Sequence, residues 1–216
     1  MNPDHDYVEI KSGDEYYVLA EALVPSLFED YETVDRKKGK DYEYVEYEPL
    51  FPFALGTFKE KAYYVTVDNY VTLTDGTGVV HIAPAFGVDD GRVGKKWDLP
   101  FVQNVNAKGE LAGGTPWDGV NVKKADKLII ADLKERGRLF AELPYEHSYP
   151  FCWRCDTPLI YYARESWFIK MTAVRDDLIK NNNTVNWIPE SIGKGRFGDW
   201  LENVQDWGIS RNRYWG

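Results

Sequence analysis

Apolar and polar residues alternate along several short segments in the first half of the chain. Residues 7–11 and 15–19 show this alternation on either side of a Ser12-Gly13-Asp14 turn, which indicates a β-hairpin. Residues 42–47 alternate in the same way and predict a half-buried strand. Two further strands are predicted where β-branched and aromatic residues are enriched, at residues 62–67 and 70–74.

A continuous apolar run at residues 78–82 follows the turn signal Asp75-Gly76. Such a run predicts a strand that is buried on both faces. His81 lies near its end, and the acidic pair Asp89-Asp90 follows and opens a short helical stretch. Many short strands separated by turn signals indicate a barrel or a sandwich.

Helical spacing replaces alternation in the second half. The spacing predicts a helix over residues 123–136, which Gly137 is well placed to end. A second helix is predicted at 172–180 with Thr172 as its N-cap, and the residues beyond 181 are interpreted as mostly loop. Residues 20–31 also have helical spacing, in which Pro25 indicates a helix start.

Composition narrows the class of protein. The chain is 44% hydrophobic and 15% aromatic, which is typical of a globular protein with a core and argues against disorder. No apolar run approaches the length that spans a bilayer, and no signal-peptide pattern follows Met1, so we expect a cytoplasmic protein without a membrane partner. The net charge of −9 has the wrong sign for a dedicated nucleic-acid binder, so any contact with nucleic acid must be local.

The acidic pair and the histidine each have a structural and a functional interpretation. Acids in the first turn of a helix complement its dipole and cap its free N–H groups, and spacing alone favours this role. The functional interpretation has one carboxylate, that of Asp90, facing a pocket and holding an ammonium group, with Asp89 as the cap. For His81, composition alone favours a hydrogen-bonded core histidine over a pocket residue.

The Cys152-Trp153-Arg154-Cys155 segment is a C-x-x-C unit. A zinc site needs four ligands, usually two such pairs, and the second pair is absent. Half of a zinc ribbon and two buried thiols are equally good interpretations, whereas a thioredoxin-like redox pair lacks its βαβ context. The basic residues 36–40 are predicted to form a solvated loop rather than a phosphate contact. Glycine-rich nucleotide loops and serine-hydrolase arrangements are absent.

Four segments in order resemble the isoleucyl-tRNA synthetases: residues 47–53, 76–90, 148–160 and 206–216. Valyl and leucyl enzymes share the editing insertion, but Pro84-Ala85-Phe86-Gly87 and the cysteine unit look most like the isoleucyl type. The resemblance implies an editing domain with a β-barrel core and helical additions, α+β overall. It implies hydrolysis of valine from mischarged Val-tRNA(Ile), because the synthetic site rejects a missing methylene by only about 1–3 kcal/mol.

The resemblance also implies roles for particular residues. The second acid of the pair, Asp90, anchors the substrate ammonium and is the predicted catalytic residue, while His81 lines the amino-acid pocket together with Thr77 and Gly78. Water is the nucleophile, and no protein general base is predicted. Editing needs no cofactor. In the full-length protein zinc is expected at Cys152 and Cys155, a half site, and ATP and Mg are expected outside this chain.

The predicted domains are an editing domain at residues 1–145, a half zinc-ribbon with a return strand at 146–170, and a linker leading into the catalytic domain at 171–216. The threonine-rich strand of the family and its adenylate-site signatures are absent, so we expect a piece of a longer synthetase that cannot aminoacylate by itself. Its expected partners are the valine-charged 3′ acceptor end of tRNA(Ile) and the remaining domains.

Three alternatives stay open at this point. The chain could be a non-catalytic module that binds the tRNA end or an amino acid. It could be the editing fragment of a valyl- or leucyl-type synthetase. It could also be a structural zinc module centred on Cys152 and Cys155.

Overall fold

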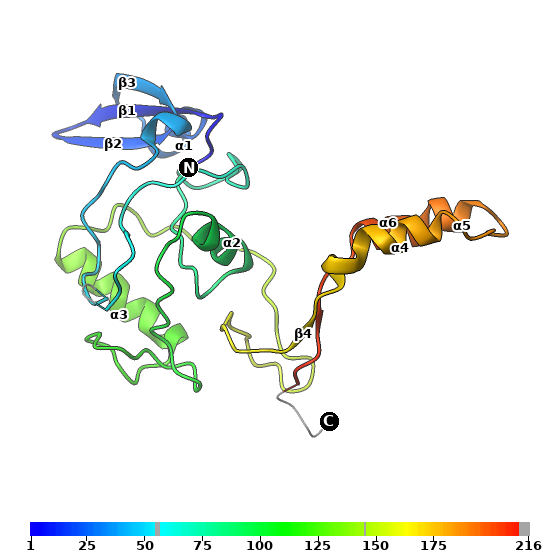
Figure 1. Ribbon diagram of the computed structural model, residues 1–216. Helices are drawn as coiled ribbons and strands as arrows, with labels where there is room; N and C mark the ends of the chain where they lie inside the picture. The colour runs from blue at the N-terminus through cyan, green and yellow to red at the C-terminus, as the bar shows by residue number, and fades with distance from the viewer. Residues whose placement is uncertain (55–56, 145, 212–216) are drawn as a thin grey trace. The chain divides into compact units, whose positions relative to one another are not determined.

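The computed structural model describes residues 1–54, 57–144 and 146–211. The chain divides into two compact units, Met1–Ala163 and Arg164–Gly216, which we call unit 1 and unit 2 and describe separately (Figure 1). Within the described residues, no helix is long and apolar enough to cross a membrane. The predicted three-part division of the chain stays a prediction.

An antiparallel sheet in unit 1 contains β1 (Asp6–Ser12), β2 (Glu15–Ala20) and β3 (Glu32–Lys38), in the order β2-β1-β3. The predicted hairpin is confirmed: Ser12 pairs with Glu15, and Gly13 takes the left-handed conformation of the turn at φ 61°. Both faces of β1 are covered. Val8 and Ile10 are buried with Leu19 and Val24, whereas Tyr7 is buried in a second cluster with Ala20 and Leu23.

Residues 36–38 lie in β3 and are exposed, so the prediction that they are solvated is confirmed, whereas the prediction of a loop is wrong for them. β3 is an edge strand whose side chains are almost all exposed, and polar residues therefore suit it and leave no alternation to detect. Its basic side chains form surface ion pairs: Arg36 with Glu21, Lys37 with Asp35 at 2.6 Å and Lys38 with Asp6 at 2.9 Å. The short helix η2 (Gly39–Tyr42) follows.

Unit 1 also holds the short helices η1 (Glu21–Leu23) and α1 (Val24–Leu27), and the longer helices α2 (Val88–Lys96) and α3 (Val122–Glu135). The helix predicted from residue 20 ends at Leu27, because Phe28 is extended. The helix predicted at 123–136 is confirmed as α3. Asn121 caps it by accepting the Lys123 N–H, and Gly137 follows it at φ 64°.

The remaining strands of unit 1 differ from the prediction. Residues 44–47 and 63–65 exchange backbone hydrogen bonds of 2.8–2.9 Å but form only an isolated bridge, Glu46 with Tyr64. Residues 70–74 and 78–82 form no strand, and Val79 and Val80 are 42% and 45% exposed. The prediction of a strand buried on both faces is therefore wrong. The regular elements form an α+β arrangement, and the β-barrel stays a prediction.

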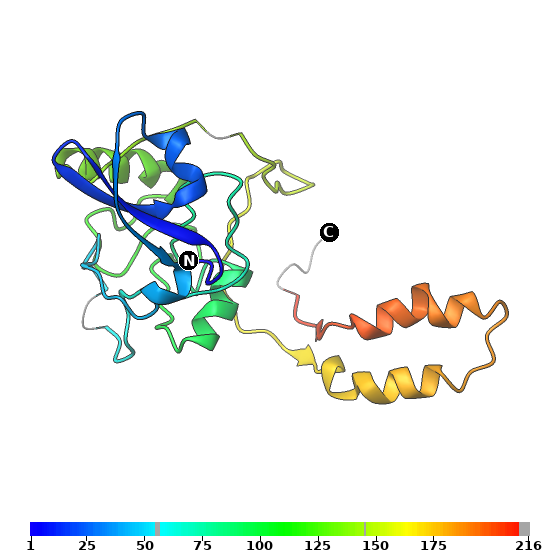
Figure 2. The same cartoon turned by 90° about the horizontal axis from the view of Figure 1, so that it is seen from above.

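Unit 2 is a helical hairpin whose two arms are joined by the short pair β4 (Phe168–Ile169) and β5 (Trp207–Gly208) (Figure 2). Between them lie η3 (Met171–Val174), α4 (Arg175–Asn182), α5 (Ser191–Lys194) and α6 (Arg196–Glu202), with α4 beside α6. The loop predicted beyond residue 181 is therefore wrong. Glycines in these helices make the sequence resemble a loop. Gly193 is needed for packing, because it lies close against Trp187 and its carbonyl accepts a 2.9 Å hydrogen bond from the Asn182 side chain.

The helix predicted at 172–180 is confirmed in its C-terminal part, as α4. Thr172 does not cap it. Its N–H and hydroxyl both donate to Oδ1 of Asp206, at 2.9 and 2.8 Å, and so connect the two arms of unit 2 near β5.

Candidate functional site

The segment from Thr77 to Asp90 begins with an anchor on the β1–β2 hairpin. The buried Tyr7 hydroxyl donates to the Gly78 carbonyl at 2.7 Å, and the Ala20 N–H donates to the Thr77 carbonyl at 2.9 Å. Gly78 has φ 71°, and an added Cβ would lie 2.5 Å from the Cβ of Ala20, so this position requires glycine. The sheet therefore fixes where the segment starts.

A tight turn and close helix packing fix where the segment ends. The Phe86 N–H donates to the Ala83 carbonyl at 2.9 Å, and α2 begins directly after the turn. Gly94 of α2 lies against Pro84, since an added Cβ at this glycine would come within 2.8 Å of the proline ring. Contact this close holds the helix and the turn as one piece.

The Asp90 carboxylate lies back across the start of α2. Its Oδ1 accepts the Ala83 N–H at 2.8 Å. Its Oδ2 sits over Gly87, where an added Cβ would be only 2.2 Å away. Within the described part of the chain no hydrogen bond reaches Oδ2. One oxygen of Asp90 is thus used to hold the carboxylate in place, and the other can accept a bond from a cationic group.

Asp89 does not cap α2 as predicted. The helix begins at Val88 with Gly87 as its N-cap residue, and no side chain caps it. The Asp89 carboxylate is 61% exposed and lies 3.6 Å from the Arg92 guanidinium. Asp89 is therefore left with the weaker role, in which a negative charge in the first turn complements the helix dipole.

An aspartate that the sequence did not single out lies on the other side of α2. The Asp68 side chain is only 11% exposed, and Arg92 donates to both of its oxygens, at 2.9 and 2.8 Å. Lys96 donates a third bond at 3.3 Å. The Arg92 hydrogen bonds hold the pKa of the Asp68 carboxyl well below its ordinary value, although burial acts in the opposite direction.

Tyr70 lies against the same arginine. The Arg92 guanidinium is 5.7 Å from the centre of the Tyr70 ring, and the Tyr70 hydroxyl is buried without a hydrogen-bond partner among the described residues. Burial raises the pKa of this hydroxyl, and the negative charges of Asp90 and Asp89 raise it further. Tyr70 therefore lies within electrostatic reach of the Asp90 carboxylate.

His81 lies between the two anchored ends of the segment, whereas Thr77 belongs to the first anchor. Both are exposed, so the interpretation of His81 as a core histidine is wrong. The Thr77 hydroxyl accepts the Val79 N–H at 3.3 Å. No hydrogen bond between the described side chains joins His81 to Asp90. The roles of His81, Thr77 and the buried Gly78 toward a substrate stay predictions.

The C-x-x-C unit forms the tip of a tight hairpin in unit 1. The Cys152 N–H donates to the Thr157 carbonyl at 2.9 Å, and Phe151 bridges to Pro158. Cys152 is buried, Cys155 is exposed, and no disulfide joins them. Two thiols on one turn fit half of a tetrahedral zinc site, but no cluster of three or more potential ligands exists among the described residues.

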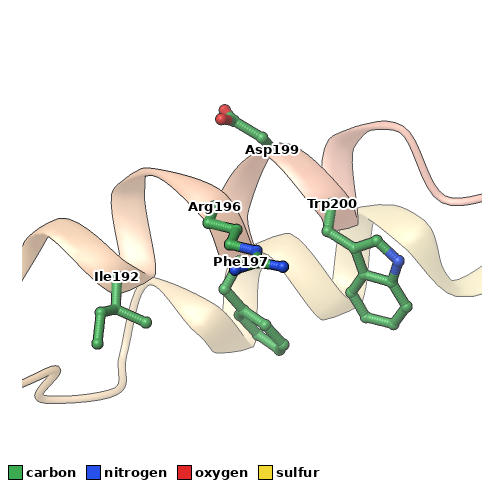
Figure 3. Close-up of a pocket in the computed structure, with 5 residues that line it drawn as sticks. All are labelled: Ile192, Arg196, Phe197, Asp199 and Trp200. Atoms are coloured by element: carbon green, nitrogen blue, oxygen red, sulfur yellow. The ribbon is translucent and has the colours of Figure 1, made fainter.

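Unit 2 contains an apolar pocket of its own. Ile192, Phe197 and Trp200 point to the same side of α5 and α6, whereas Asp199 points away (Figure 3). The Phe197 and Trp200 rings are 5.8 Å apart. None of the predicted site residues lines this pocket.

Comparison with known proteins identifies the family. Residues 7–216 match the family model described as tRNA synthetases class I (I, L, M and V). The chain belongs to the class I tRNA synthetases. Over the whole of its own length, this chain is 51% identical to the isoleucine–tRNA ligase of Clostridium acetobutylicum, 46% to that of Picrophilus torridus and 44% to that of Thermus thermophilus. The chain spans only about a fifth of the length of these curated relatives.

The predicted resemblance to isoleucyl-tRNA synthetases is thus confirmed, and the relatives of this chain are ligases.

What sequence reasoning missed is the Asp68–Arg92 pair with Tyr70. Arg92 and Lys96 are spaced one turn apart on a predicted helix, which could have indicated a shared acidic partner. Asp68 itself stands in an Asp-Asn turn signal between two predicted strands, and nothing local distinguishes it from a loop residue.

Proposed function

We propose that this chain carries the editing site of an isoleucine–tRNA ligase and hydrolyses the ester that joins valine to tRNA(Ile). The observation that carries the proposal is the Asp90 carboxylate, held by the Ala83 N–H at 2.8 Å with its second oxygen open, in a chain of the class I synthetase family. An aminoacyl ester presents an α-ammonium group, which is the partner that such an oxygen binds best.

A separate editing site is needed because the synthetic site discriminates poorly between isoleucine and valine. One missing methylene in an apolar pocket changes binding by about 1–3 kcal/mol, so valine enters the synthetic site of an isoleucine enzyme. In the proposed site water attacks the ester carbonyl, the bond to the ribose oxygen breaks, and valine and free tRNA(Ile) leave. Isoleucine is excluded by size, and His81 lines the side-chain pocket.

Asp90 contributes by holding and orienting the substrate. Its open oxygen binds the α-ammonium, which places the ester carbonyl relative to water and to the terminal ribose. The proposal includes no protein general base. Thr77 and Gly78 supply neighbouring backbone groups at the anchored start of the segment.

The proposal extends to the whole protein and its partners. The full-length enzyme would join isoleucine to tRNA(Ile) with ATP, and ATP and Mg would bind outside this chain. Only the single-stranded acceptor end of the tRNA would reach the editing site, which accords with a net charge of −9. The remaining domains would supply the rest of the tRNA contact. We place this protein in the cytoplasm.

Two structural parts of the proposal concern the barrel and the zinc. The backbone bonds between residues 44–47 and 63–65, together with the exposed apolar residues Val79 and Val80, are what a barrel with absent partner strands would leave. Cys152 and Cys155 would hold zinc together with a second cysteine pair outside this chain.

The test uses the full-length Clostridium acetobutylicum relative with this chain in place of its matching segment, which we call the chimaeric ligase. Its hydrolysis of preformed Val-tRNA(Ile) is measured beside an Asp90→Ala variant. We expect Asp90→Ala to slow hydrolysis about 10- to 100-fold, because a hydrogen bond between charged groups contributes about 1.5–3 kcal/mol. Asp89→Asn, the neighbouring acid, serves as the matched control and should change the rate less than about threefold. Equal rates for the parent and Asp90→Ala would contradict the proposal.

Binding to the isolated chain and turnover by the chimaeric ligase together distinguish a hydrolytic site from a simple binding module. A non-catalytic module would bind a non-hydrolysable valyl-adenosine analogue saturably, and the chimaeric ligase would show no turnover that depends on Asp90. Turnover that Asp90→Ala removes excludes this alternative.

A further inference from the structure

We propose that Asp68 is a positioning residue for Asp90: it holds α2 in place through Arg92 and Lys96, and so sets where the Asp90 carboxylate lies. The inference rests on the proposed function, since it concerns the same site. It assigns a role to an ion-pair network around the largely buried Asp68 carboxylate that neither the hydrolysis scheme nor the sequence prediction uses.

The contacts to Asp68 are of the kind that fix a geometry. Arg92 makes two parallel bonds with the carboxylate, at 2.9 and 2.8 Å, and such a fork restricts both distance and angle. Lys96, one helical turn further along, reaches the same carboxylate at 3.3 Å. Two attachment points on one helix restrict its rotation as well as its position along its axis.

Asp68 is itself held firmly. Its side chain is 11% exposed, whereas those of Arg92 and Lys96 are 49% and 53% exposed. Its Oδ1 also accepts the Tyr70 N–H at 3.4 Å, and the Lys96 ammonium donates to the neighbouring Val67 carbonyl at 3.4 Å. The carboxylate is therefore a fixed point against which the two longer side chains are positioned.

The network reaches Asp90 through the helix that both share. Asp90 lies in the first turn of α2, two residues before Arg92, and the Arg92 guanidinium also lies 3.6 Å from Asp89. The bond from Ala83 to Asp90 spans 2.8 Å between the helix and the preceding turn, so a small rotation of α2 breaks it. The packing of Gly94 on Pro84 does not depend on Asp68. Losing this aspartate should therefore release the start of α2 while the helix itself stays folded.

The experiment uses the chimaeric ligase with Asp68→Asn, which keeps the shape of the side chain and removes its charge. We expect hydrolysis of Val-tRNA(Ile) to slow about 10- to 100-fold, since a displacement of about 1 Å in a positioned group has that effect. Aminoacylation with isoleucine should stay at the parent rate, which shows that the protein is folded. Asp68→Glu, which keeps the charge, should recover part of the hydrolysis. The matched control is Asp132→Asn, which removes an Asp–Arg pair of 2.6 Å on α3 and should leave hydrolysis unchanged.

A double-mutant cycle distinguishes positioning from general support. If Asp68 acts through Asp90, then Asp68→Asn causes no further loss in an Asp90→Asn background. The same fold loss in both backgrounds would overturn the inference and leave the proposed function intact.

A second measurement decides the inference even if the proposed function fails. If the parent chimaeric ligase does not hydrolyse Val-tRNA(Ile), the proposed function is wrong, and hydrogen exchange at the Ala83 amide becomes the test. Faster exchange in Asp68→Asn, by about tenfold or more, supports positioning because that amide is protected by its bond to Asp90. Unchanged exchange overturns the inference.

Discussion

Replacing Gly87 by alanine tests whether the Asp90 carboxylate is held where the structure places it. An added Cβ would lie 2.2 Å from Oδ2 of Asp90 and 2.9 Å from its Cγ. Gly87 has φ −158°, an extended conformation that alanine adopts freely, so the backbone itself causes no strain. The carboxylate therefore has to move, and its 2.8 Å bond from the Ala83 N–H breaks.

The expected magnitude follows from these contacts. A lost hydrogen bond to a charged group costs about 1.5–3 kcal/mol, and the alanine gains back about 0.4–1 kcal/mol through the unfolded chain. We expect Gly87→Ala to lower the free energy of unfolding of unit 1 by about 1–2 kcal/mol. Hydrolysis of Val-tRNA(Ile) by the chimaeric ligase should fall about 10- to 100-fold, as for a displaced substrate anchor.

The assay is urea denaturation of the chain, followed by tryptophan fluorescence and by exchange of the Ala83 amide. Asp90→Ala is the control background, since it removes the two atoms with which the new methyl group collides. There Gly87→Ala should cost less than about 0.5 kcal/mol. An equal cost in both backgrounds, or an Ala83 amide that stays protected in Gly87→Ala, would refute the reasoning.

Three further predictions concern the network, the anchor and the cysteines. The lowered pKa of Asp68 means that its contribution to stability is present above its ordinary value of 3.8 and is lost as the pH falls through the folded value. Asp68→Asn should therefore lower the free energy of unfolding of the chain by about 1.5–2 kcal/mol at pH 7. The difference in stability between the parent and Asp68→Asn should shrink only below about pH 4. A difference that already shrinks between pH 7 and 5 would contradict this prediction. Tyr7→Phe removes a buried hydroxyl that donates to Gly78 at 2.7 Å, and urea titration should show a loss of about 1–3 kcal/mol, whereas a neutral effect would rule out the anchor. Zinc analysis of the chimaeric ligase should find metal that Cys152→Ser reduces, and equal zinc in both proteins excludes the half site.

Local signals in the sequence predicted the hairpin and the long helix correctly. The Gly13 turn joins two segments that contact each other directly, and α3 has an Asn121 cap and a Gly137 stop at its ends. Each of these elements is specified by residues inside it or next to it. The sequence does not predict the short helices of unit 2, because glycine disfavours helices. Gly193 is nevertheless required there, since a side chain at this position would collide with Trp187.

Strands depend on partners that the local sequence does not contain. β3 is polar because it is an edge strand, and its pairing with β1 comes from residues far away along the chain. Val79 and Val80 have the composition of a buried strand, yet they are exposed, because no described segment forms a ladder with them. Composition indicates that a segment can be a strand, whereas pairing decides whether it is one.

The candidate site was predicted in part for the same reason. The sequence indicates His81 and Asp90 because they lie near the end of an apolar run and just after it, and because they match a family pattern. Asp68 and Tyr70 lie elsewhere in the sequence and join the site through tertiary contacts: Arg92 and Lys96 both bond to Asp68, and Arg92 lies against the Tyr70 ring. The prediction that Asp89 caps α2 is wrong, because the helix begins at Val88 and the Asp89 side chain therefore lies near Arg92 rather than over the helix end.

The central claim is that the open oxygen of Asp90 binds the α-ammonium of the aminoacyl ester. The most direct measurement compares single-turnover hydrolysis of Val-tRNA(Ile) with that of the same tRNA carrying 2-hydroxy-3-methylbutyrate, in which a hydroxyl replaces the ammonium. The parent chimaeric ligase should hydrolyse the valyl ester about 10- to 100-fold faster, in line with about 1.5–3 kcal/mol for the charged hydrogen bond, and Asp90→Asn should remove most of that preference. A preference that persists unchanged in Asp90→Asn would contradict the claim.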